Sequence, residues 1–266
     1  EAADLITTAY EKTLDQKTFK YVFTEDTTTP YPVLFFVQGV EYKVLGQYPA
    51  SIHLFGTGEG APPIMLFGSD ELGRDIFSRT FYGSRISLSI SLFGVLISFM
   101  IGILLGGISG YFGGSTDEVI QRLIDVIISI PLIPFWMALS AAVPKDWSQI
   151  QTYFAITLIL SLIGWTWLAR QLRGVVLSLR ESDDIMAARL AGASDARIIF
   201  KHLVPATIGQ IIVVATLSLP SMILAETALS YLGLGLRPPT TSWGVLLNEV
   251  QNLQSLALYP WVFSPA

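Results

Sequence analysis

Four long apolar segments decide most of what this chain can fold into. They occupy residues 86–111, 120–143, 153–168 and 207–228, of which the third is somewhat short for the roughly 20 residues that cross a bilayer core as a helix. The chain is 52% hydrophobic and only 14% charged, outside the norm for soluble domains. Because lipid supplies no hydrogen-bond partners, a backbone that crosses it must satisfy its own polar groups, as a helix does. The sequence therefore predicts an all-α polytopic membrane protein.

The apolar segments carry features of helices that pack together. Pro131 and Pro134 lie in the second segment and Pro220 in the fourth, and neighbouring helices or water must satisfy the carbonyl that an interior proline leaves free. The first segment has a glycine at every fourth residue, which lets another backbone approach one helix face closely. That face fits packing within the chain or a contact between subunits, and both stay open. Its glycines are Gly102, Gly106, Gly110 and Gly114.

Residues 1–85 differ in character from the rest. Segments such as 18–23, 33–37 and 41–45 combine aromatic and β-branched residues, and prolines and glycines separate them, which is typical of short strands and turns. An amphipathic stretch at 76–86 leads into the first apolar segment. We therefore expect a small, partly β extramembrane segment that ends in an amphipathic helix.

Basic residues orient the chain. The loop 169–206 holds six of them, whereas the loop 144–152 holds only Lys145. By the positive-inside tendency, 169–206 is cytoplasmic, and 1–85 and 229–262 are extracytoplasmic. The six are Arg170, Arg173, Arg180, Arg189, Arg197 and Lys201. Residues 243–253 indicate an amphipathic helix too short to span, so 229–262 is expected to be re-entrant or interfacial.

The loop between the third and fourth apolar segments contains signals for two short helices. Ser182 or the acids after it can cap a first helix, and Gly192 fits the end of that helix. Ser194 or Asp195 can cap a second helix that runs to about Leu203. Two alanines in the first helix leave a bare patch near the turn, and small residues at a helix tip suit insertion into another protein. The alternative is a loop that only connects two spans and binds no other protein.

This stretch resembles the cytoplasmic coupling loop of ABC-transporter permeases, whose pattern is Glu-Ala-Ala, three residues, Gly, nine residues, Ile-x-Leu-Pro. The matching positions hold Ala187, Ala188, Gly192 and Pro205. The chain departs from the pattern at three positions, which hold Met186, His202 and Val204. Because Met186 replaces the acid of the pattern, any ionic contact with an ATPase must come from its neighbours. The residues expected to couple are Asp183, Asp184, Met186, Ala187, Ala188, Arg189, Gly192, Ala193 and Pro205.

Further stretches resemble one branch of these permeases, the second permease subunit of oligopeptide and dipeptide importers. The resemblance covers about residues 65–262, and its motifs lie at 67–75, 82–88, 226–235, 238–239 and 242–244. It implies a permease helix bundle of six spans, so one span is expected before Glu1 and one beyond Ala266. It also implies partners: a related permease subunit that completes a heterodimeric pore, two cytoplasmic ATPase subunits, and an extracytoplasmic substrate-binding protein.

The chain is expected to do no bond chemistry of its own. It has no cysteine and no glycine-rich loop followed by Lys-Ser or Lys-Thr, so no P-loop is predicted and ATP hydrolysis belongs to other subunits. His53 and His202 share no ligand spacing, so neither a metal site nor a cofactor is predicted. The net charge of −5 suggests no nucleic-acid partner. Oligosaccharides or metal chelates are alternative substrates, and an ion-coupled secondary transporter is the alternative from another class.

Two acids in the apolar segments need a role. Glu226 lies near the end of the fourth segment, where an acid is costly and often lines a pathway, so it is a candidate for the translocation path. The alternative, which we weigh as stronger, is that it braces residues 229–235. Asp125 is expected to pair with Arg122 at helical spacing.

Overall fold

The computed structural model describes residues 6–14, 16, 21–44, 47–58, 60–251 and 259–264. It divides into two compact units, each described by itself. One comprises Glu1–Phe77 with Gln254–Ser264, and the other comprises Ser78–Leu253 with Pro265–Ala266. The division falls inside the first long helix, upstream of the expected boundary at residue 85.

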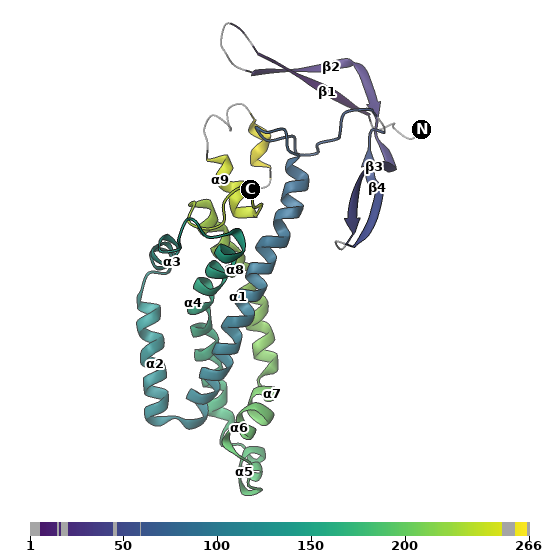
Figure 1. The fold of residues 1–266 in the computed structure, drawn as a ribbon. Coiled ribbons are helices and arrows are strands. Elements are labelled where there is room, and N and C mark those ends of the chain that lie inside the picture. Colours follow the sequence, from purple (N-terminus) through teal and green to yellow (C-terminus); the bar gives the residue numbers. More distant parts are fainter. Residues whose placement is uncertain are drawn as a thin grey trace. The chain divides into compact units, whose positions relative to one another are not determined.

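The N-terminal unit contains two separate β-hairpins (Figure 1). In the first, β1 (Ile6–Leu14) pairs antiparallel with β2 (Tyr21–Pro32), and in the second β3 (Leu34–Val44) pairs antiparallel with β4 (Tyr48–Gly56). The β character expected for this segment is confirmed, but the strands are longer than the short runs predicted. Residues 18–20 and 45 of those runs lie outside the described part.

A buried acid shapes the turn that leads into the first long helix. Asp70 accepts hydrogen bonds from the backbone N–H groups of Leu72 and Arg74, both at 2.9 Å, and its second oxygen pairs with the Arg74 guanidinium at 2.7 Å. In the same unit, the indole of Trp261 donates to the Ser69 carbonyl at 2.8 Å. One stretch of the permease resemblance, at 67–75, is therefore a structural turn.

The helices are α1 (Ile76–Phe112), α2 (Gly114–Ser129), α3 (Leu132–Ala141), α4 (Gln149–Leu179), α5 (Asp183–Leu190), α6 (Asp195–Ile198), the π-helix η1 (Ile199–Leu203), α7 (Val204–Ala206), α8 (Ile208–Tyr231), α9 (Trp243–Val250) and the 3-10 helix η2 (Pro260–Phe263). Three of these, α1, α4 and α8, are long and apolar enough to cross a membrane. The amphipathic stretch expected as a separate helix is the first part of α1, which runs unbroken from Ile76. The predicted membrane helix bundle is confirmed.

The second apolar segment is not a straight span. It forms α2 and α3, whose axes are bent by 83° at a short break, so the pair makes a broken span or a re-entrant loop. Ile130 is extended, with ψ 128°, because a residue before proline is pushed out of the helical region. Pro131 then starts α3 from its N-cap position. The span predicted at 120–143 is therefore bent at the proline, and whether the pair crosses the membrane stays a prediction.

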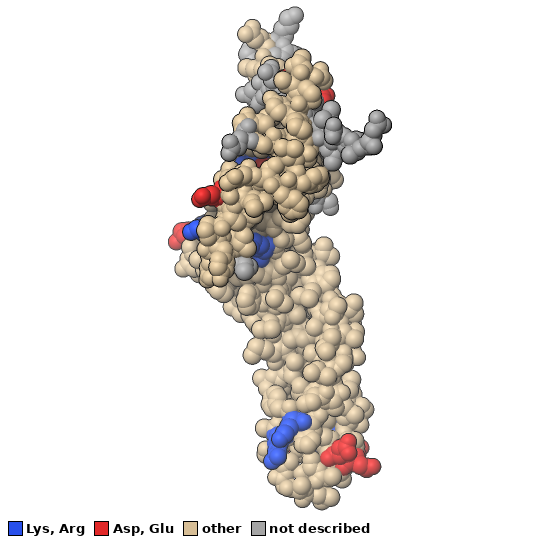
Figure 2. All heavy atoms as spheres, turned by 90° about the vertical axis from the view of Figure 1, so that its right-hand side faces the viewer, with Lys and Arg blue, Asp and Glu red and all other residues tan. Residues whose placement is uncertain are grey.

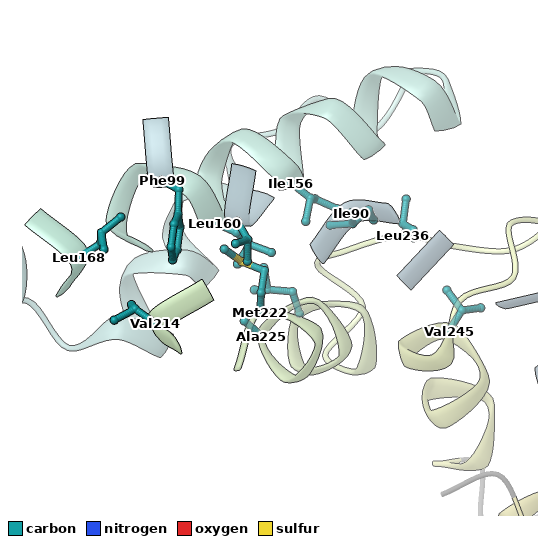
Figure 3. Packing of buried hydrophobic residues seen from close by; sticks show 12 residues of the cluster. Ile90, Phe99, Ile156, Leu160, Leu168, Val214, Met222, Ala225, Leu236 and Val245 are labelled. Carbon is teal, nitrogen blue, oxygen red and sulfur yellow. The ribbon is translucent and has the colours of Figure 1, made fainter. Parts of the chain in front are cut away.

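The core of the bundle lies between α1, α4 and α8 (Figure 3). Ile90 of α1, Leu160 of α4 and Met222 of α8 belong to one buried cluster, which continues to Val245 of α9. On the face drawn in Figure 2, no charged side chain among the described residues shows over the middle of the bundle. An apolar surface over the middle of the bundle suits contact with the hydrocarbon core of a bilayer.

The glycine stripe of α1 packs inside this chain. A Cβ on Gly106 would lie 2.7 Å from the Ala169 carbonyl oxygen of α4, and one on Gly110 would lie 2.7 Å from Cβ of Val176. Gly102 meets α4 in the same way, whereas Gly114 begins α2 and meets nothing within 4 Å. Of the two uses left open, close packing of α1 on α4 is the one the structure shows, and Gly114 takes no part in it.

Candidate functional site

The loop 181–205 forms two short helices joined by a tight turn, as predicted. Ser182 is the N-cap of α5, and its side chain makes no capping hydrogen bond there. At the other end, the N–H of Gly192 donates to the Arg189 carbonyl and the N–H of Ala193 donates to the Ala188 carbonyl, at 3.0 and 3.1 Å. These two bonds make a Schellman motif, which needs a residue of positive φ after the helix. Gly192 supplies it with φ +81°.

The second helix of the loop has an irregular form. The Ser194 side chain accepts from the N–H of Arg197 and caps α6, which continues as the π-helix η1 to Leu203. Pro205 lies in the short helix α7, just before α8 begins. Proline has no N–H to donate to the carbonyl of Lys201 four residues earlier, so one hydrogen bond of a regular α-helix is missing at this point.

Buried side chains attach the loop to the ends of two spans. Ile185 of α5 and Ile198 of α6 are buried in one cluster with Tyr111 of α1 and with Leu172 and Val176 of α4. Full burial of a side chain of this size stabilises by about 1.5–3 kcal/mol. The loop is therefore packed against the ends of α1 and α4.

Tyr111 links the end of α1 to both helices of the loop. Its hydroxyl donates to Asp195 at 2.7 Å, and the Arg189 guanidinium lies over its ring at 5.5 Å from the centroid. The Arg189 guanidinium also approaches the hydroxyl at 3.5 Å. Tyr111 was not among the residues predicted to act in this loop, although a tyrosine at the end of an apolar segment, close to a basic loop, was a signal that the sequence contained.

The outer surface of the loop exposes small and apolar side chains. Leu190 is 89% exposed and Met186, one helical turn earlier, is 47% exposed. Ala187 is exposed between them, and a Cβ on Gly192 would meet nothing within 4 Å. Other predicted coupling residues flank this surface: Asp183, Asp184, Arg189 and Pro205 are exposed, and Ala188 and Ala193 are half-buried. The tip is apolar at its centre and charged at its edge.

Ion pairs fasten α2 to α4 near the same end. The Arg173 guanidinium makes two hydrogen bonds with the Asp117 carboxylate, each at 2.5 Å. Further along α2, Asp125 pairs with Arg170 of α4 at 2.6 Å. The pairing of Asp125 with Arg122 predicted from helical spacing is wrong, because the acid faces α4 and finds a partner on that helix.

Glu226 occupies a buried junction at the opposite end of the bundle. Its side chain is fully buried, and its two carboxylate oxygens accept from the hydroxyls of Ser87 and Ser230, at 2.9 and 2.8 Å. Each serine oxygen in turn accepts a backbone N–H of the following loop, from Trp243 to Ser87 and from Leu236 to Ser230, both at 3.1 Å. One carboxylate thus organises two serines and, through them, two loop amides.

This junction unites stretches that are far apart in the sequence. Ser87, Glu226 and Trp243 come from three separate motifs of the permease resemblance. Gly244 belongs with them, because a Cβ there would lie 2.7 Å from the Thr227 carbonyl oxygen of α8. The geometry favours the bracing role for Glu226, and its place in a translocation path stays a prediction.

We expect Glu226→Ala to lower the free energy of unfolding by about 2–4 kcal/mol, because two buried hydroxyls lose their acceptor at about 1–3 kcal/mol each. Amide hydrogen exchange should speed up at Leu236 and Trp243, and the apparent unfolding temperature in detergent should fall. Glu226→Gln keeps a carbonyl acceptor and is the matched control, with a smaller loss. Unchanged exchange at both amides in Glu226→Ala would contradict the bracing role.

The described residues define a class of protein: a membrane-embedded helix bundle with a structured two-helix loop protruding at one end. Residues 102–264 match the family model described as the binding-protein-dependent transport system inner membrane component, and the chain belongs to this family. The match includes the loop 181–205 and, of the junction, Glu226, Ser230, Leu236 and Trp243, whereas Ser87 lies before the matched residues.

Named relatives agree with this assignment, and a solved structure shares the fold. The chain is 40% identical over 201 residues to the oligopeptide transport system permease protein OppC of Bacillus subtilis (strain 168), covering 75% of this chain and 63% of that one. It is 42% identical over 195 residues to the dipeptide transport system permease protein DppC of the same strain, covering 73% and 59%. The chain thus spans about three fifths of the length of these relatives. An inward-facing structure of the MetNI methionine ABC transporter has the same fold, with a TM-score of 0.53 at 17% identity, covering 71% of this chain and 94% of that one.

Proposed function

We propose that the chain is a transmembrane subunit of an ATP-driven ABC importer and forms half of a translocation pathway for oligopeptides or dipeptides. The family assignment and the names of the relatives support the transport class, and those names also support peptides as the substrate class. The observation that carries the proposal is the form of the loop 181–205. It has an exposed apolar tip at Met186 and Leu190, and its root, Ile185 and Ile198, is buried against α1 and α4.

In this proposal, two cytoplasmic ATPase subunits grip the exposed tip around Ala187–Gly192. When they close on ATP, the loop moves, and its buried root transmits the displacement to α1 and α4. Tyr111 ties both loop helices to the end of α1, so the loop moves as one piece with that span. The result is alternating access, while the chain itself hydrolyses nothing and needs no cofactor.

The remaining partners follow from the same proposal. A second, related permease subunit completes the pore, and an extracytoplasmic binding protein delivers substrate on the side of the membrane where 1–85 and 229–262 are expected. The loop 169–206 is then cytoplasmic in a multi-pass protein of the inner membrane. Oligosaccharides and metal chelates are alternative cargoes within the same class. An ion-coupled secondary transporter would leave the exposed loop tip without a use.

The absence of cysteine from the chain allows a direct test of the docking. We expect Leu190→Cys, at the most exposed part of the tip, to form a disulfide or bismaleimide cross-link with an ATPase subunit in the intact complex. Ile150→Cys is the control, since it is similarly exposed at the other end of α4. Cross-linking of the Ile150 variant alone, or an intact transporter that purifies without ATPase subunits, would contradict the importer proposal.

A further inference from the structure

A cavity of about 200 Å³ lies at the end of α4 opposite the loop 181–205. It is enclosed by the connection between α3 and α4 and by the loop that follows α8. Two of its lining hydroxyls, Oγ of Ser140 and Oγ1 of Thr240, are buried and have no hydrogen-bond partner within the described chain. Ser140 is only 4% exposed. Buried hydroxyls are normally hydrogen-bonded, so these two point to a group that the cavity receives.

The same cavity is lined by two cations, Lys145 and Arg237. Among the residues with described positions, neither forms an ion pair with an acid. Nε and Nη2 of Arg237 donate to the Gly233 carbonyl at 3.3 and 3.1 Å, which leaves other guanidinium N–H groups available. Asp146 follows Lys145 in sequence but does not line the cavity. Two cations beside two hydroxyl donors are suited to a phosphate group.

A second cavity and a row of exposed apolar side chains on α4 adjoin this cavity. A second cavity, of about 310 Å³, shares Gln149, Leu236 and Thr240 with the first and is otherwise lined by apolar and aromatic side chains. From there, every fourth residue of α4 is a large apolar side chain that is 46 to 70% exposed. These residues are Ile150, Phe154, Leu158 and Leu162. At 1.5 Å per residue the stripe is about 18 Å long, similar to the roughly 15 Å half-thickness of a bilayer core.

We propose that these features bind one anionic phospholipid. The phosphate occupies the first cavity, between Lys145 and Arg237, and the hydroxyls of Ser140 and Thr240 donate to its oxygens. An acyl chain follows the second cavity and the stripe on α4. A short peptide carboxylate would match the cations, but it would leave most of the stripe uncovered. The location at the end of a span, where lipid headgroups lie, favours the lipid.

Native mass spectrometry of the full chain in detergent, with phosphatidylglycerol or phosphatidylcholine added, tests the site. We expect preferential retention of phosphatidylglycerol and a higher unfolding temperature in its presence. The double variant K145A/R237A should bind it at least about tenfold more weakly, because hydrogen bonds to charged groups are lost. Arg122→Ala is the matched control: it removes an exposed cation elsewhere and should bind the lipid as the original chain does.

A second variant separates binding from folding. Thr240→Val removes a hydroxyl that has no hydrogen-bond partner among the described residues, so the unfolding temperature without lipid should not fall. The increase caused by phosphatidylglycerol should shrink. Equal retention of the two lipids, or equal phosphatidylglycerol binding by K145A/R237A and Arg122→Ala, would overturn the proposal. Protection by inorganic phosphate or by dialanine that matches protection by the lipid would also overturn it, in favour of a free-anion or a peptide site.

Discussion

Replacement of Gly106 by leucine is expected to lower the free energy of unfolding by about 3 kcal/mol and the apparent unfolding temperature by about 6–12 °C. A Cβ at this position would lie 2.7 Å from the Ala169 carbonyl oxygen and 2.9 Å from its Cα. Both atoms belong to the α4 backbone, which cannot rotate away as a side chain can. The variant must therefore separate α1 from α4, and the yield of monodisperse protein in detergent should fall with it.

Gly174→Leu is the matched control for this prediction. It also replaces a helical glycine by leucine, on α4, but a Cβ there meets nothing within 4 Å. The control should express like the original chain and be at least as stable, because helix propensity favours leucine over glycine. If both variants unfold at the same temperature, close packing of α1 on α4 does not stabilise the bundle.

The second large effect is expected on transport. Gly192→Leu should reduce peptide uptake about tenfold or more in proteoliposomes that contain the whole complex, while ATP hydrolysis and membrane insertion persist. The φ of +81° strains any residue with a Cβ, by about 1–2 kcal/mol for a left-handed conformation. The turn is exposed, so this strain distorts the loop tip without disturbing the buried cluster at its root. The leucine side chain would also project where an ATPase subunit is proposed to bind.

Gly192→Asn separates the two causes, because asparagine tolerates positive φ better than other side chains. It should keep the Schellman motif and retain more uptake than the leucine variant. Measuring uptake and hydrolysis on the same proteoliposomes gives the coupling ratio. Normal coupled uptake by Gly192→Leu would remove the docking role from this turn, even if the family assignment holds.

Local signals predicted the loop well because its structure is local. Capping residues, a glycine at a helix end and small residues at a tip act within a few residues, and the two helices form at 183–190 and from 195 onward. The buried contacts of the loop with α1 and α4 could not be predicted from such local signals. Tyr111 meets Asp195 only because α1 and α4 pack together, and no spacing in the sequence encodes that contact.

The partners of two acidic side chains were likewise set by packing and not by local spacing. Helical spacing offered Arg122 to Asp125, but the acid pairs with Arg170, which lies 45 residues away in sequence. Glu226 was noticed as a costly acid, yet one of its two hydrogen bonds comes from Ser87, 139 residues earlier. Both partners lie on other helices, so packing selected them.

By itself, the sequence determined the class of environment, the existence of the long apolar helices, the two-helix loop and the family, because hydrophobic length, capping chemistry and ordered motifs are all local properties. Only the tertiary structure shows that the glycine face of α1 packs against α4, that α2 and α3 are bent at Pro131, and that Glu226 connects three motifs that are distant in the sequence. Those outcomes depend on which helix surfaces pack together. Side-chain complementarity between segments that are remote in the sequence decides which surfaces do so.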